Sequence, residues 1–243
     1  MANTISNSIQ NTIQNIFSAK GIALIIVFAA LHTVVSTLPF TITIGVEGAI
    51  TLGVITVPLI GIILGPISGG IAALIGSVIA MFVSPSGAIF GPFSFLPATI
   101  GAMSAGFAFT KRGYISAALL LAGIVGFYVH PYGMDAIGYP FLHIIAVVVA
   151  LIFSTGLAVW STDLSNFKKL SVGIPVAAFV GTLTDNIVGS SLAIWMFDLE
   201  AAVWNFVMFI YPIERIVAVI ITVAIALPLY YSLRKSGILS LIR

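Results

Sequence analysis

Long apolar runs alternate with short polar breaks along almost the whole of this 243-residue chain. Eight such runs can be distinguished, and most approach the roughly 17–25 residues that a membrane-spanning helix needs. They cover residues 19–38, 49–64, 66–83, 93–110, 114–130, 139–160, 172–197 and 212–233. The pattern therefore predicts an all-α fold, namely a polytopic membrane helix bundle with six to eight transmembrane segments.

The second and third runs leave the number of spans open. They are short, and little more than Gly65 and Pro66 separates them. The sequence is compatible with two full spans here, or with the two arms of a re-entrant hairpin. Both arrangements return the chain to the side from which it came, so the orientation of the remaining runs is the same in either case.

A polar segment precedes the first run. Residues 1–18 are rich in Asn, Ser, Thr and Gln, and their isoleucines recur at helical spacing. This pattern predicts a short amphipathic helix on the membrane surface, with a disordered tail as the alternative. The expected organisation is a polar amphipathic segment (1–18), a single transmembrane helical bundle (19–235) and a cytoplasmic tail (236–243).

Charges are rare and unevenly placed. They make up 7% of the residues, and none occurs between Glu47 and Lys111. Most basic residues instead stand at alternate ends of successive runs: Lys20, Lys111, Arg112, Lys168, Lys169, Arg234 and Lys235. The positive-inside rule places these ends in the cytoplasm. We therefore expect a multi-pass protein of the plasma (cytoplasmic) membrane with both termini cytoplasmic.

Several classes of chemistry have no signature in this chain. It contains no cysteine, which excludes disulfides, thiolate metal sites and cysteine catalysis. It has no phosphate-binding loop of the G-x-x-x-x-G-K-[ST] kind, no H-E-x-x-H and no G-x-S-x-G. We expect no enzymatic activity, no cofactor and no metal, and the scattered basic residues do not indicate nucleic-acid binding.

Asp185 is an acid near the middle of an apolar run. An ionisable group at that depth costs at least about 2.5–3.5 kcal/mol to insert, so it requires a partner or a water-filled cavity. It belongs to a polar stripe along one helix face, formed by Thr182, Asp185, Asn186, Gly189 and Ser190. We expect the stripe to contact a ligand or an ion. The alternative is that it only hydrogen-bonds to a neighbouring helix.

Other polar residues share the predicted outer half with Asp185. Arg215 is the single basic residue expected there, and its forked guanidinium suits a ligand carboxylate or phosphate, or Asp185 itself. A lone histidine such as His32 more often bridges helices than binds a metal. His143 is the better site candidate, because it shares the outer half with Tyr139, Arg215 and Asp185. The candidate substrate-binding residues are Asp185, Asn186, His143, Arg215, Glu214, Trp195 and Tyr139.

Small residues recur at four-residue spacing in two of the runs. Such pairs let helices approach closely, either within one bundle or at a contact with another membrane subunit. The candidates for coupling to a partner are Gly69, Ala73, Gly76, Gly101 and Ala105.

Three stretches carry a resemblance to a known family. Residues 52–82 (LGVITVPLIGIILGPISGGIAALIGSVIAMF) resemble the second and third helices of S components of energy-coupling factor (ECF) transporters, where a Leu-Gly-Pro turn joins two apolar helices. Residues 95–113 (FLPATIGAMSAGFAFTKRG) and 212–235 (PIERIVAVIITVAIALPLYYSLRK) are similar to later parts of archaeal-type members. The family core has six helices, and its Ala-x-x-x-Ala coupling motif is missing from the first run here.

The resemblance implies a membrane-embedded substrate-binding subunit of an ECF-type ABC importer, which captures a vitamin or related micronutrient from outside. It also implies partners, namely a transmembrane coupling subunit and ATPase subunits, besides the small-molecule substrate and membrane lipid. The alternative is a stand-alone proton-coupled secondary transporter of a small molecule, in which Asp185 takes up a proton. The sequence shows no clear inverted repeat of the kind found in many such transporters.

Overall fold

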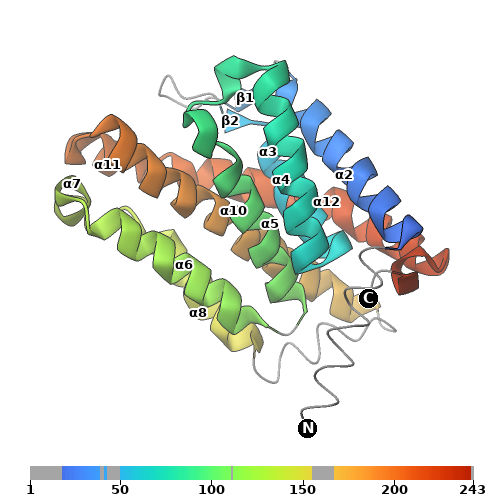
Figure 1. Ribbon diagram of the computed structural model, residues 1–243. Coiled ribbons are helices and arrows are strands. Elements are labelled where there is room, and N and C mark those ends of the chain that lie inside the picture. The colour runs from blue at the N-terminus through green and yellow to red at the C-terminus, as the bar shows by residue number, and fades with distance from the viewer. Residues whose placement is uncertain (1–17, 39–40, 43–49, 111, 155–166, 242–243) are drawn as a thin grey trace, which may run out of the picture.

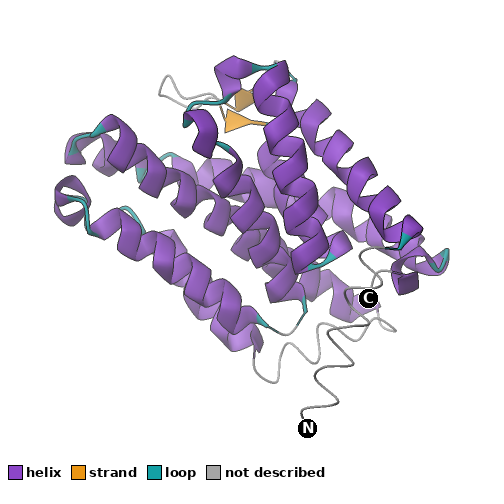
Figure 2. Ribbon diagram, in the orientation of Figure 1, coloured by secondary structure: helices purple, strands orange, loops and turns teal. Residues whose placement is uncertain are grey.

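The computed structural model describes residues 18–38, 41–42, 50–110, 112–154 and 167–241, which form a bundle of helices (Figures 1 and 2). The amphipathic helix expected over residues 1–18 lies, except for Ser18, outside the described residues.

Each of the eight apolar runs contains one principal helix. Within the described ranges, five helices are long and apolar enough to cross a membrane, α5 together with the short turn before it. These five are α2 (Ala19–Thr37), α4 (Pro66–Val83), α5 (Phe95–Phe109), α10 (Phe167–Phe197) and α12 (Tyr211–Lys235). The three shorter apolar helices are α3 (Gly53–Leu64), α6 (Gly113–Tyr128) and α8 (Phe141–Ser154). These helices agree with the predicted helical membrane bundle, whereas the number of spans and the side on which the termini lie remain predictions.

Short elements connect these helices. The strands β1 (Thr41–Ile42) and β2 (Ile50–Thr51) pair antiparallel, a detail that the all-α prediction missed (Figure 2). The other connecting elements are η1 (Pro85–Gly87), η2 (Gly91–Phe93), α7 (Pro131–Asp135), α11 (Ala201–Val207) and η3 (Ile238–Leu241).

Helices α5 and α10 lie side by side at the centre of the bundle (Figure 1). Helices α6 and α8 pack on one side of this pair, and α2, α3 and α4 pack on the other. A Cβ atom added at Gly101 of α5 would lie 2.7 Å from the Cβ atom of Asp185 and 3.1 Å from the carbonyl oxygen of Gly181. Small side chains are thus what let the two central helices approach this closely.

Helix α3 is the short, fully buried first arm of a helical hairpin. Every one of its 12 residues is buried, and its length is about 18 Å against a hydrocarbon thickness of about 30 Å. Gly65 turns the chain with a φ of 82°, which suits glycine, and Pro66 then begins α4. Because α3 is too short to extend to both faces of the membrane, its first residue lies inside the bundle.

Most of the described basic residues gather at one end of the molecule. Lys20 at the start of α2 lies beside residues 236–238, which follow α12. Helix α6, which Arg112 precedes, begins toward the same end (Figure 1). Leu239 in the following turn is buried and packs against the core of the bundle. Which side of the membrane this end faces remains a prediction.

Candidate functional site

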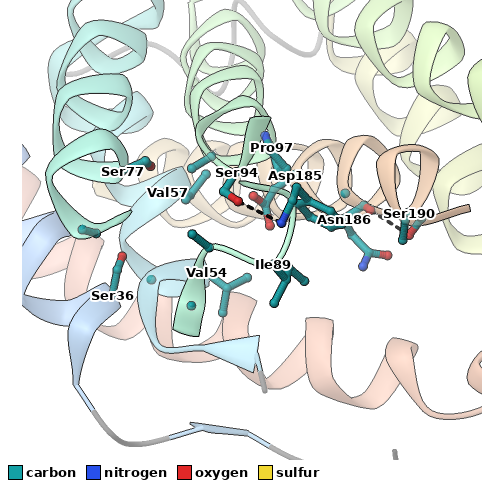
Figure 3. Close-up of a pocket in the computed structure, with 18 of the residues that line it drawn as sticks. Ser36, Val54, Val57, Ser77, Ile89, Ser94, Pro97, Asp185, Asn186 and Ser190 are labelled. Atoms are coloured by element: carbon teal, nitrogen blue, oxygen red, sulfur yellow. Dashed lines mark hydrogen bonds between the residues drawn. The ribbon is translucent and has the colours of Figure 1, made fainter. Parts of the chain in front are cut away.

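A cavity of about 360 Å³ lies between the helices (Figure 3). None of its lining residues is shared with the group around Lys20 and residues 236–238. Its walls come from α2, α3, α4, α5, α10, α11 and α12, together with the 3-10 turns before α5. The first residues of the short helix α3 line it, so the cavity occupies space that a longer α3 would fill. Its volume lies within the range of small-molecule sites.

One end of the cavity is charged. Asp185 comes from the middle of α10, whereas Glu214 and Arg215 come from the first turn of α12, which Tyr211 and Pro212 begin. The Arg215 Nη1 atom lies 3.6 Å from Asp185 Oδ2, and the two side chains are 9% and 15% exposed. The pair is therefore largely removed from solvent while both residues still line the cavity.

The Asn186 amide connects this ion pair to His143. Its NH2 group donates to His143 Nε2 at 2.9 Å, and its oxygen accepts from Arg215 Nη2 at 3.1 Å and Nε at 3.3 Å. This orientation of the amide is the one that satisfies all its neighbours. Three helices, α8, α10 and α12, are thereby linked through one guanidinium.

Aromatic side chains form the wall next to the charged end. Tyr139, Trp204 and Tyr211 line the cavity, with ring centroids 4.9–5.0 Å apart between Tyr139 and each of the other two. The Tyr139 hydroxyl hydrogen-bonds to Ser190 Oγ at 2.6 Å, and the Tyr211 hydroxyl donates to the Tyr139 carbonyl at 2.9 Å. Both phenol hydroxyls form hydrogen bonds within the protein. The aromatic rings of these residues, and not their hydroxyls, are therefore the groups offered to a ligand in the cavity.

The other end of the cavity is polar without formal charge. His32 and Ser36 of α2 and Ser77 of α4 line it. His32 Nδ1 lies 2.6 Å from Thr56 Oγ1 and its Nε2 lies 3.0 Å from Ser77 Oγ. His32 therefore bridges three helices, as the interhelical interpretation of a lone histidine expects. Figure 3 shows Ser36 and Ser77 across the cavity from Asp185, with apolar side chains between.

Five of the seven predicted substrate-binding residues line this cavity: Asp185, Asn186, Glu214, Arg215 and Tyr139. His143 lies behind it, fully buried, with its ring stacked on Tyr211 at 5.3 Å. These placements bring the residues together in space, and a role in binding remains a prediction.

Trp195 lies away from the cavity, so the structure does not bring this candidate together with the others. It is ten residues beyond Asp185, which turns its side chain by about 80° around the helix axis. Its Nε1 atom donates to the carbonyl of Gly126 on α6 at 2.8 Å, and the side chain is 55% exposed. Trp195 thus belongs to the outer contact between α10 and α6.

The small residues expected at a partner surface are all buried inside the bundle: Gly69, Ala73, Gly76, Gly101 and Ala105. A Cβ atom at Gly69 would lie 2.9 Å from the Cα atom of Gly61, and one at Gly76 would lie 2.6 Å from the carbonyl oxygen of Ala29. The structure therefore corrects the partner-surface interpretation of these residues and assigns them to close packing within the chain, the alternative that the spacing left open.

The candidate residues chosen from the sequence omit three aromatic side chains that line the cavity, Phe90, Trp204 and Tyr211. Tyr211 precedes Glu214 and Arg215 by three and four positions, which places it on the same helix face, so its spacing carried a usable signal. Trp204 and Ser77 carried none, because they reach the cavity from other helices. Within the described part of the chain, no three histidine or acidic side chains form a group that would hold a metal ion.

No family model matches the chain. It is similar to MJ0923, an uncharacterized protein of Methanocaldococcus jannaschii, with 32% identity over 147 residues. The similarity covers 60% of this chain and 48% of the relative, so the chain spans about half the length of the curated relative it matches. No solved structure matches.

Proposed function

We propose that this chain is the membrane-embedded substrate-binding subunit of an ECF-type ABC importer in the plasma membrane. It captures a vitamin or related micronutrient from outside and carries out no chemistry of its own. The observation that carries the proposal is the cavity of about 360 Å³ inside a helical membrane bundle, with a largely buried ion pair in its wall.

Intramembrane charges that border a cavity support a ligand site. Burying Asp185 and Arg215 is costly, and an ion pair that served packing alone would gain little over apolar side chains of similar volume. Here the pair borders a space of small-molecule size, walled by aromatic rings and apolar side chains. Concave sites of this composition are typical of small-molecule binding.

The proposed direction of capture follows from the charges. Lys20, Arg234 and Lys235 lie at the end of the bundle away from the cavity. If the basic end faces the cytoplasm, the cavity opens toward the outside. The sequence has no phosphate-binding loop, so the energy for uptake is assigned to a coupling subunit and ATPase subunits.

The proposal is tested by identifying small molecules retained by the purified protein. Gly189 lines the cavity, and a Cβ atom there has its nearest neighbours at 3.8 Å or more, so Gly189→Leu is expected to fill the cavity without displacing the backbone. Gly126→Leu is the matched control, because Gly126 lies outside the cavity and its nearest neighbour would be at 3.5 Å.

Mass spectrometry of denatured wild-type and Gly126→Leu protein should release the same small molecule, which Gly189→Leu should lack. All three proteins should show the same helical circular dichroism. A retained molecule that persists in Gly189→Leu would contradict the site, and recovery of lipid alone from the wild type would contradict the function.

A further inference from the structure

We propose that the substrate is an organic cation, held by its positive group at the Asp185–Glu214 end of the cavity. This inference rests on the proposed function, because it specifies the chemical class of the molecule that occupies the same cavity. It is carried by the balance of charges around the cavity, by the existing partners of Arg215, and by the aromatic wall beside them.

Acidic side chains outnumber basic ones in the cavity wall. Among the described residues that line it, Asp185 and Glu214 are acidic and Arg215 is basic. The described basic residues Lys20, Arg234 and Lys235 lie at the opposite end of the bundle. A cleft lined by one excess sign of charge concentrates ligands of the opposite sign.

Arg215 is already committed to partners inside the protein. Its Nη1 atom faces Asp185 at 3.6 Å, and its Nη2 and Nε atoms donate to the Asn186 oxygen. An anionic ligand would have to compete with these contacts for the guanidinium, and it would also approach two carboxylates. A cationic ligand leaves these contacts of Arg215 intact and approaches the two carboxylates of Asp185 and Glu214.

The backbone does not reverse this balance. Helices α3, α5 and α12 begin at the cavity and contribute positive helix ends, whereas α2, α4 and α11 end there and contribute negative ones. These partial charges offset one another. The far end, with His32, Ser36 and Ser77, offers hydrogen bonds to a neutral polar group and adds no acid or permanent cation.

The aromatic wall is also suited to a cation. Tyr139, Trp204 and Tyr211 stand beside the charged end, and their polar atoms are engaged elsewhere, with Trp204 Nε1 donating to the Leu199 carbonyl at 3.0 Å. Electron-rich rings attract ammonium groups at short range. Carboxylates and aromatic rings together therefore favour an amine or quaternary ammonium group over a carboxylate or phosphate.

The test uses three probes of similar size and different charge: tryptamine (positive), tryptophol (neutral) and indole-3-propionate (negative). Their binding to the purified full chain is measured by calorimetry at physiological ionic strength. Tryptamine is expected to bind roughly tenfold more tightly than tryptophol, and indole-3-propionate most weakly. No measurable binding of tryptamine, or binding of either other probe with equal or higher affinity, overturns the inference.

Two variants locate the effect. Glu214→Gln removes one negative charge with almost no change in volume, and it is expected to reduce the preference for tryptamine over tryptophol severalfold. Asp135→Asn removes an exposed acid outside the cavity, whose effect salt screens, and it should leave the preference unchanged. Equal loss in both variants, or loss in neither, contradicts the assignment to the cavity.

Different results would contradict the cationic substrate and the proposed binding function. If the molecule released from wild-type protein is neutral or anionic and is absent from Gly189→Leu, the cation inference is wrong and the binding function stands. If the protein releases lipid alone and binds none of the three probes, both are wrong.

Discussion

The Asp185 carboxylate and the Arg215 guanidinium lie 3.6 Å apart, joining the middle of α10 to the first turn of α12. Both residues are costly in a membrane protein, and each compensates the charge of the other. Because Asn186 also accepts from Arg215, the pair fixes the position of α12 against α10 at the cavity. We therefore expect the stability of the protein to fall by different amounts when position 185 loses only its charge and when it becomes apolar.

Asp185→Leu is expected to destabilise the protein strongly. It leaves the buried Arg215 cation without its carboxylate, which typically costs about 3–5 kcal/mol of unfolding free energy. Asp185→Asn keeps a hydrogen-bonding group and should cost less, while weakening binding of the substrate. Thermal denaturation in detergent, followed by intrinsic fluorescence, measures the order of the three midpoints.

The matched control is the double variant Asp185→Leu/Arg215→Met, which removes both charges. Its midpoint should lie well above that of Asp185→Leu alone, because no unpaired charge remains. Strictly additive losses in the two single variants and the double variant would show that the ion pair contributes no coupling.

Gly101→Ala is expected to reduce stability by about 1–3 kcal/mol, through overpacking between α5 and α10. The added Cβ atom would lie 2.7 Å from Asp185 Cβ and 2.9 Å from Val57 Cγ1. Gly126→Ala is the control, since its Cβ atom meets nothing nearer than 3.5 Å and alanine favours the helix by up to about 1 kcal/mol. A Gly101→Ala midpoint equal to that of Gly126→Ala would contradict the close packing seen here.

The helical bundle could be predicted from the sequence because few backbone structures are stable in lipid. Long apolar runs must satisfy their backbone groups internally, so each of the eight runs contains a helix. The length of α3 was not accessible in the same way. The run from residue 49 is apolar throughout, and only the chain's path through β2 shows that the helix begins at Gly53.

The sequence predicted those site residues whose insertion into a membrane costs free energy, and it did not predict the positions of the others. Asp185, Glu214 and Arg215 could be identified because a charged side chain in lipid is unfavourable and requires a partner or water. The position of Trp195 outside the cavity could not be predicted, because an aromatic residue is equally acceptable at a lipid interface and the face it occupies depends on the packing of α6. Spacing alone showed that Gly101 allows close approach, whereas which helix approaches it is a property of the tertiary fold.

Labelling of single cysteines tests the predicted orientation, and the absence of natural cysteines makes the experiment clean. Met134 in α7 is 60% exposed near the cavity end, and Ser236 is exposed just after α12. In intact cells a membrane-impermeant maleimide should label Met134→Cys and spare Ser236→Cys until the membrane is permeabilised. Labelling of Ser236→Cys alone before permeabilisation would invert the topology.

The most direct measurement of the proposed function is uptake by the protein reconstituted alone in liposomes. The ligand is the molecule released from the wild-type protein, supplied in labelled form outside the vesicles, with and without an imposed proton gradient. We expect saturable binding that Gly189→Leu abolishes, and no accumulation in the lumen under either condition. Accumulation driven by the proton gradient would contradict the proposed function and establish a stand-alone secondary transporter.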